Sequence, residues 1–107
     1  MKSYDVSLTP DAVQDLMDIY LWIAEKSGLP EVALSYIESL RRQCQTLETA
    51  PYRGRLREDI RPDLRIVPLA DNAVAAFQID ETAQSVLILN IFYGGRDYET
   101  LMGSDDT

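Results

Sequence analysis

The sequence predicts an α+β domain of order β-α-α-β-β-β, in which a helical hairpin packs on a small, mostly antiparallel sheet. Two segments with apolar residues at helical spacing follow one alternating segment, and three short apolar segments come after them. The chain has 107 residues, which fits one domain. We place that domain at residues 1–102 and expect a disordered tail at residues 103–107.

The first strand and first helix are indicated by local signals. Tyr4, Val6 and Leu8 alternate with polar residues, which is typical of a half-buried strand. Thr9 and Pro10 then provide a hydroxyl N-cap and a proline at the first helical position. The expected apolar face of this helix consists of Val13, Leu16, Met17, Tyr20, Ile23 and Ala24. Gly28 is expected to end the helix.

A second helix is predicted from Pro30 to Ala50, with Pro51 ending it. Its expected apolar face consists of Ala33, Tyr36, Ile37, Leu40, Cys44 and Leu47. Two amphipathic helices joined by a short loop pack as an antiparallel hairpin. The second helix should therefore lie beside the first.

The rest of the chain reads as a loop followed by three strands. The loop is the stretch PYRGRLREDIRPD, which carries two prolines and one glycine. The predicted strands are residues 64–69, 73–79 and 86–93. In the last strand, the odd-numbered and the even-numbered positions are both mainly apolar, as expected for a central strand that is covered on both faces.

Composition and charge exclude several classes of protein. The net charge is −8 and there is no histidine, so the chain is a poor general binder of phosphate backbones. We expect no direct nucleic-acid binding, no metal and no cofactor. A single cysteine, Cys44, allows no internal disulfide and fits a reducing compartment. No signal peptide or membrane span is evident, so we expect a cytoplasmic protein.

Five of the ten basic residues gather between residues 53 and 65, against three acids. Arg55, Arg57 and Arg61 stand in the predicted loop, either as a binding patch or as solvated charge paired with Glu58 and Asp59. This segment is the locally positive part of an acidic chain.

A second candidate group lies at the ends of the predicted strands. Arg65 alternates with two apolar neighbours, and Arg96 follows the last strand. We expect these arginines to gather with Tyr93 and Tyr98 at one end of the sheet. Such a group would bind carboxylate or phosphate and offer rings for stacking, and structural salt bridges remain the alternative.

The order of these pieces resembles the RelE/ParE toxin superfamily and is most similar to its ParE branch. The matching segments are TPDAVQDLMDIYLWI, then ALSYIESLRRQCQTLETAPYRG with its Pro-x-x-Gly loop, then DLRIVPL, AVAAFQID and VLILNIFYGGRD. The resemblance covers residues 4 to about 102. It implies a toxin of a type II toxin–antitoxin pair that is neutralised by a cognate antitoxin in a hetero-oligomer.

The resemblance also implies one of two activities. Members like RelE cleave mRNA in the ribosome, whereas members like ParE inhibit DNA gyrase by binding it. RNA cleavage needs a base, a cationic stabiliser and an acid. In a nuclease these roles would fall to Arg65, Tyr93 and Arg96, but tyrosine titrates near 10 and arginine higher, so no base works at neutral pH. We therefore favour a gyrase inhibitor that is not an enzyme.

The residues predicted to bind a partner are Arg55, Arg57, Arg61, Arg65, Tyr93, Arg96 and Tyr98. Toxins of this group are often neutral or basic and their antitoxins acidic, so a charge of −8 departs from the family pattern. A third interpretation, beside gyrase inhibitor and mRNA endonuclease, is a non-toxic module that only binds its antitoxin.

Overall fold

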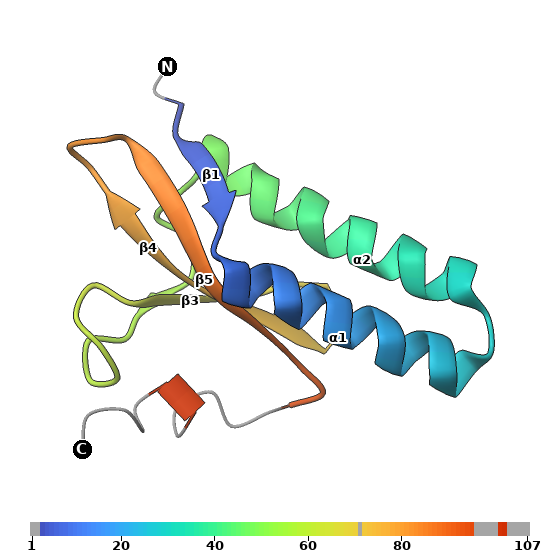
Figure 1. Cartoon of the computed structure of the whole chain (residues 1–107). Coiled ribbons are helices and arrows are strands. Elements are labelled where there is room, and N and C mark those ends of the chain that lie inside the picture. Colours follow the sequence, from blue (N-terminus) through green and yellow to red (C-terminus); the bar gives the residue numbers. More distant parts are fainter. Residues whose placement is uncertain (1–2, 71, 96–100, 103–107) are drawn as a thin grey trace.

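The computed structural model describes residues 3–70, 72–95 and 101–102. Two helices lie against one face of a five-stranded sheet (Figure 1). The helices are α1 (Pro10–Ser27), α2 (Pro30–Gln45) and the short 3₁₀ helix η1 (Thr46–Glu48), and the strands are β1 (Asp5–Leu8), β2 (Arg55–Leu56), β3 (Arg65–Pro68), β4 (Ala73–Asp80) and β5 (Ser85–Tyr93). The predicted α+β fold class is confirmed. The predicted tail at residues 103–107 lies outside the described part of the chain.

The strand order is β1-β5-β4-β3-β2, with β1 parallel to β5 and the other neighbours antiparallel. The segment predicted to be entirely loop contains the short strand β2, which pairs with β3 through Arg55–Ile66 and Leu56–Arg65. Two residues are too few to show alternation in a sequence. Gly54 introduces this strand with a φ of +76°, and a Cβ there would lie 2.2 Å from the Ile66 carbonyl oxygen.

The predicted start and end of the first helix are confirmed. The Thr9 hydroxyl accepts a hydrogen bond from the Ala12 amide at 3.1 Å, and Pro10 is the first residue of α1. Gly28 ends the helix in the left-handed conformation with a φ of 71°, and its amide donates to the Ala24 carbonyl at 2.9 Å. Short-range chemistry is sufficient to explain both ends.

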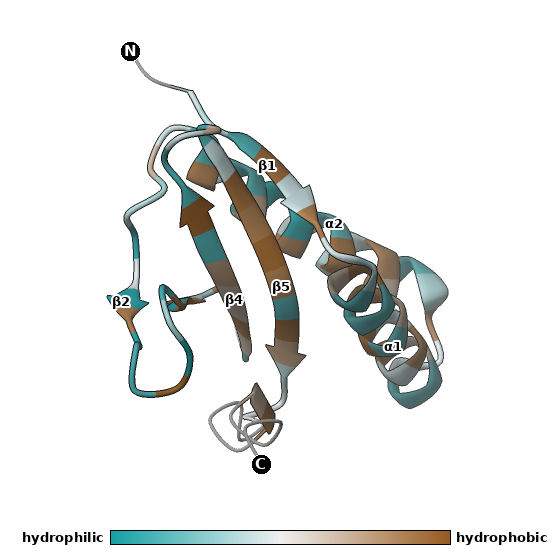
Figure 2. Ribbon diagram, turned by 60° about the vertical axis from the view of Figure 1, so that its left-hand side comes forward, coloured by the Kyte–Doolittle hydropathy of each residue, from teal (hydrophilic) through white to brown (hydrophobic). Residues whose placement is uncertain are grey.

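The main core lies between the helical hairpin and the sheet, where the apolar stripes of the helices face β5 (Figure 2). The buried residues of α1 are Ala12, Leu16, Ile19 and Ile23, and those of α2 are Ala33, Ile37, Leu40 and Cys44. The expected face of α1 was partly wrong, because Val13 and Met17 are 53% and 57% exposed. They lie beside the row that packs on the sheet.

A second, smaller core covers the opposite face of the sheet. It consists of Ile60, Leu64, Ile66, Ala76, Phe92 and Met102. The strand β5 contributes to both cores, because Ile88 and Ile91 pack toward the helices while Phe92 packs on the other side. The prediction that this strand is covered on both faces is therefore confirmed.

Candidate functional site

Arg65 lies on the face of the sheet that carries the helices, directly opposite the core residue Phe77 of β4. Its guanidinium donates to the backbone carbonyls of Arg53 at 3.2 Å and Tyr52 at 3.1 Å. The same group stands 5.5 Å from the centre of the Tyr52 ring. Arg65 therefore holds the segment between η1 and β2 against the sheet.

A carboxylate joins this segment to the start of β1. Glu81 accepts hydrogen bonds from the hydroxyls of Tyr52 and Tyr4, the latter at 2.8 Å. The bond to Glu81 raises the pKa of Tyr4, as do burial and the carboxylate charge. Sequence reasoning missed this cluster, because its three members are far apart in the chain.

Tyr93 lies at the other end of the sheet, opposite Ala73 of β4. Its ring makes edge-to-face contacts with Trp22 of α1 and Tyr36 of α2, each with 5.5 Å between ring centres. The partners of Arg65 and Tyr93 on β4 are Phe77 and Ala73, which lie four positions apart along the strand. The expected gathering of these two residues at one end of the sheet is thus not observed.

The other members of that predicted group, Arg96 and Tyr98, lie outside the described residues. The two glycines before them are described and adopt left-handed φ angles of 78° and 72° at Gly94 and Gly95. The Gly94 amide still donates to the Asn72 carbonyl at 3.0 Å. The chain therefore leaves the sheet through a turn that favours glycine.

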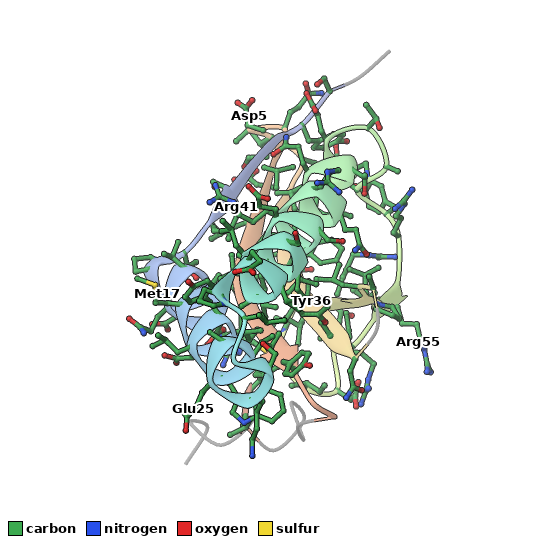
Figure 3. All side chains as sticks on the ribbon, turned by 90° about the vertical axis from the view of Figure 1, so that its right-hand side faces the viewer. Asp5, Met17, Glu25, Tyr36, Arg41 and Arg55 are labelled. Atoms are coloured by element: carbon green, nitrogen blue, oxygen red, sulfur yellow. The ribbon has the colours of Figure 1, made fainter. Side chains whose placement is uncertain are left out.

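The loop arginines differ from one another in their surroundings. Arg55 is exposed and projects from the margin of the molecule, far from Met17 on α1 (Figure 3). Arg57 is half-buried and binds Asp59 through two bonds of 2.9 and 2.8 Å, which lowers the pKa of that carboxyl. Arg61 is half-buried and donates to the Met102 carbonyl at 2.7 Å. The predicted pairing with Asp59 is therefore observed for Arg57, whereas Arg61 binds a backbone carbonyl.

A groove of about 640 Å³ runs between β1 and the hairpin. We call it the hairpin groove; it is lined by Val6, Ser7, Leu8, Val13, Leu16, Met17, Tyr20, Leu34, Ile37, Arg41 and Gln45. Leu34 on α2 is 51% exposed, similar to Val13 and Met17 on α1. A cluster of large exposed apolar side chains is characteristic of a protein-binding surface. The sequence signal for it was an apolar row at residues 13, 17 and 21, beside the row that α1 buries.

The described part of the chain gives little support for a reactive cysteine or a metal site. The Cys44 thiol is buried, which raises its pKa to about 11, so it is an unreactive core side chain. No three His, Cys, Asp or Glu side chains among the described residues gather to hold a metal ion. None of the described helices has the length and apolar character needed to cross a bilayer.

A comparison of the sequence with models of protein families identifies the family of this chain. Residues 6–98 match the family model described as the ParE toxin of the type II toxin–antitoxin system parDE. The chain belongs to the ParE toxin family. This membership agrees with the resemblance to the ParE branch that the sequence shows.

Solved structures show the same ParE/RelE fold. A chain of the chromosomal ParDE toxin–antitoxin system from P. aeruginosa has a TM-score of 0.72 and 24% identity, covering 85% of this chain and 96% of that one. A chain of the toxin–antitoxin complex RelBE2 from Mycobacterium tuberculosis has a TM-score of 0.60 and 20% identity, with coverages of 90% and 97%. No curated protein matches this ParE-family sequence.

Proposed function

We propose that this ParE-family chain inhibits DNA gyrase by binding it, and that a cognate antitoxin neutralises the chain by covering the hairpin groove. The observation that carries the proposal is the exposure of Val13, Met17 and Leu34 along one groove. A soluble domain of this size gains nothing in stability from leaving such side chains in water. An amphipathic helix of the antitoxin fits the shape and chemistry of this surface.

The positions of the candidate nuclease residues support protein binding over RNA cleavage. Arg65 holds backbone carbonyls and the Tyr52 ring, and Tyr93 packs against both helices. The two side chains lie at different ends of the sheet, so they do not converge on one phosphate. The sequence has no histidine to act as base, and Lys26 lies over the Trp22 ring at 5.7 Å.

The proposal places the site of action in the cytoplasm, where gyrase works, and requires neither a cofactor nor a membrane. The arginines and tyrosines predicted from the sequence remain proposed contacts to the partners. Among the members that the structure describes, Arg55 is the exposed one, and the others are half-buried (Figure 3). The hairpin groove adds an apolar surface that the predicted set did not contain.

Two measurements on the same protein test the activity. The purified chain should block the supercoiling of relaxed plasmid by gyrase, and induced expression should leave mRNA 5′ ends unchanged. Codon-phased cuts in mRNA with normal supercoiling would instead establish a ribosome-dependent endonuclease. If neither effect occurs while an antitoxin still binds, the chain is a non-toxic binding module and the proposal is wrong.

A substitution in the hairpin groove tests the antitoxin surface. Met17→Glu places a charge among apolar residues and should weaken binding of the antitoxin encoded next to this chain by about tenfold or more. Val32→Glu is the matched control, because Val32 is 45% exposed on α2 but does not line the groove. Equal affinity of both variants for the antitoxin would show that the antitoxin binds elsewhere.

A further inference from the structure

The strand β5 extends past the end of β1 and leaves part of its edge without a neighbouring strand. In the described residues, β1 pairs only with Ser85–Ile88 and then turns into α1. The Thr9 hydroxyl donates to the Leu89 carbonyl at 2.8 Å, and the Asp15 carboxylate accepts from the Ile91 amide at 2.8 Å. Alternation directs the amide of Tyr93 to the same edge.

A groove of about 340 Å³ lies between this edge and α1. We call it the edge groove; it is lined by Asp15, Asp18, Ile19 and Trp22 of α1 and by Ile91, Tyr93 and Gly94. Asp15, Asp18 and Trp22 are spaced by three and four residues, so they form one row along the helix. The groove thus has a strand edge as one wall and two carboxylates with an aromatic ring as the other.

The electrostatics of the edge groove favour a positively charged occupant. Burial raises the pKa of Asp15, and the negative charges of Asp11 and Asp18 raise it further. The hydrogen bonds from Ile91 and Asn90 lower the pKa by a smaller amount. Three carboxylates therefore repel one another along one row of α1, and a cation beside them would relieve that repulsion.

The aromatic ring of the edge groove already has a cation beside it. The Lys26 ammonium stands 5.7 Å from the centre of the Trp22 ring, and Trp22 is 51% exposed. This contact is independent of the carboxylates, and it shows that the Trp22 ring is accessible to a cationic side chain.

We propose that the edge groove receives an extended segment of the antitoxin that carries an arginine or lysine side chain. The backbone of the segment adds as a strand beside Ile91–Gly94, and its cation lies between Asp15 and Asp18. The identity of the partner rests on the proposed function, whereas the chemistry of the groove does not. An acidic toxin surface would then meet a basic antitoxin side chain, which is the reverse of a basic toxin with an acidic antitoxin and agrees with the net charge of −8.

A short peptide tests the groove without any partner protein. The probe is the acetylated and amidated peptide Val-Thr-Arg-Val-Thr, and the readouts are the fluorescence of Trp22, the single tryptophan, and the NMR shift of the Tyr93 amide. Both signals should change saturably as the peptide reaches millimolar concentration, and added salt should lower the affinity of the peptide. The same peptide with Glu in place of Arg should produce neither change. Absence of both changes with the Arg peptide would overturn the proposal.

Variants of an exposed groove residue sharpen this test. Asp18→Asn should weaken the peptide about threefold to tenfold, and Asp18→Lys should abolish binding. Asp18 is exposed and accepts a hydrogen bond from its helical neighbour Gln14 at 2.9 Å, so circular dichroism should show an intact fold. Glu38→Gln is the matched control, since Glu38 is exposed on α2 outside the groove. Wild-type affinity in Asp18→Lys would overturn the proposal.

A comparison of two partners distinguishes the antitoxin from the target. Asp18→Lys should weaken binding of the adjacently encoded antitoxin by tenfold or more and leave inhibition of gyrase supercoiling unchanged. Loss of gyrase inhibition with normal antitoxin binding would assign the groove to the target and overturn the proposal. If the wild-type chain fails to inhibit gyrase, the proposed function fails, but the peptide and antitoxin affinities still decide the role of the groove.

Discussion

The Asp15 carboxylate accepts the amide hydrogen of Ile91 at 2.8 Å and an amide hydrogen of Asn90 at 3.0 Å, both at Oδ2. These bonds join α1 to β5 just beyond the point where β1 ends. A side chain of the helix thus satisfies a backbone group that a neighbouring strand would otherwise bind.

Replacement of Asp15 by leucine should lower the free energy of unfolding by about 1–3 kcal/mol, because the Ile91 amide loses its acceptor. Asp15→Asn keeps a carbonyl oxygen at the same place and should cost less than about 1 kcal/mol. Urea unfolding of both variants measures the difference. Equal losses for leucine and asparagine would show that the bond to Ile91 contributes nothing specific.

The stability of the wild-type chain should also depend on pH through Asp15. Burial raises its pKa above the ordinary value of 3.8. The folded chain then holds this proton more tightly than the unfolded chain, so the contribution of Asp15 is greatest below pH 3.8 and falls as pH rises through the raised pKa. Wild type should lose stability relative to Asp15→Asn across that window. Parallel stability curves for the two proteins would refute the assignment.

Two glycines with similar φ angles should respond very differently to alanine. At Gly54 an added Cβ would lie 2.2 Å from the Ile66 carbonyl oxygen, whereas at Gly28 nothing lies within 4 Å. Gly28→Ala should cost about 1 kcal/mol for its left-handed backbone, and Gly54→Ala should cost several times more because β2 must move away from β3. Thermal unfolding compares them, and similar melting temperatures would contradict the close approach at Gly54.

Tyr93 should act through its ring and not through its hydroxyl. Tyr93→Phe keeps the contacts with Trp22 and Tyr36 and should retain both stability and toxicity. Tyr93→Ala removes them and should cost about 2–4 kcal/mol. Growth arrest on induction and urea unfolding provide the two readouts. A stable Tyr93→Phe variant without toxicity would indicate a chemical role for the hydroxyl and favour the nuclease.

Arg55 and Arg61 each contribute one positive charge, but only Arg61 donates to the Met102 carbonyl at 2.7 Å. Arg61→Ala should lower the free energy of unfolding by about 1–2 kcal/mol, and Arg55→Ala should leave it within about 0.5 kcal/mol of wild type. If Arg55 contacts a partner, its loss should weaken binding in a salt-dependent way. Equal stabilities of the two variants would show that the Met102 contact is not stabilising.

Elements with local signals can be predicted from the amino-acid sequence alone. Thr9, Pro10 and Gly28 act on backbone groups within a few residues, so the limits of α1 follow from neighbouring side chains alone. Short apolar segments bounded by turn residues likewise predicted β4 and β5 nearly to their observed ends. The family resemblance was also present in the order of these pieces, and the match over residues 6–98 confirmed it.

Contacts between side chains that are distant in the sequence depend on how the strands assemble. The register of β5 shifts at Leu89, so that Asn90 pairs with Ala76 while Ile88 pairs with Phe77. One unpaired residue reverses the alternation after it and turns Tyr93 toward the helices. Such a shift depends on contacts between distant strands and leaves no pattern in the sequence. For the same reason, the sequence could not predict that Arg65 and Tyr93 lie apart, nor that a groove lies beside Asp15, because both features depend on the assembled sheet.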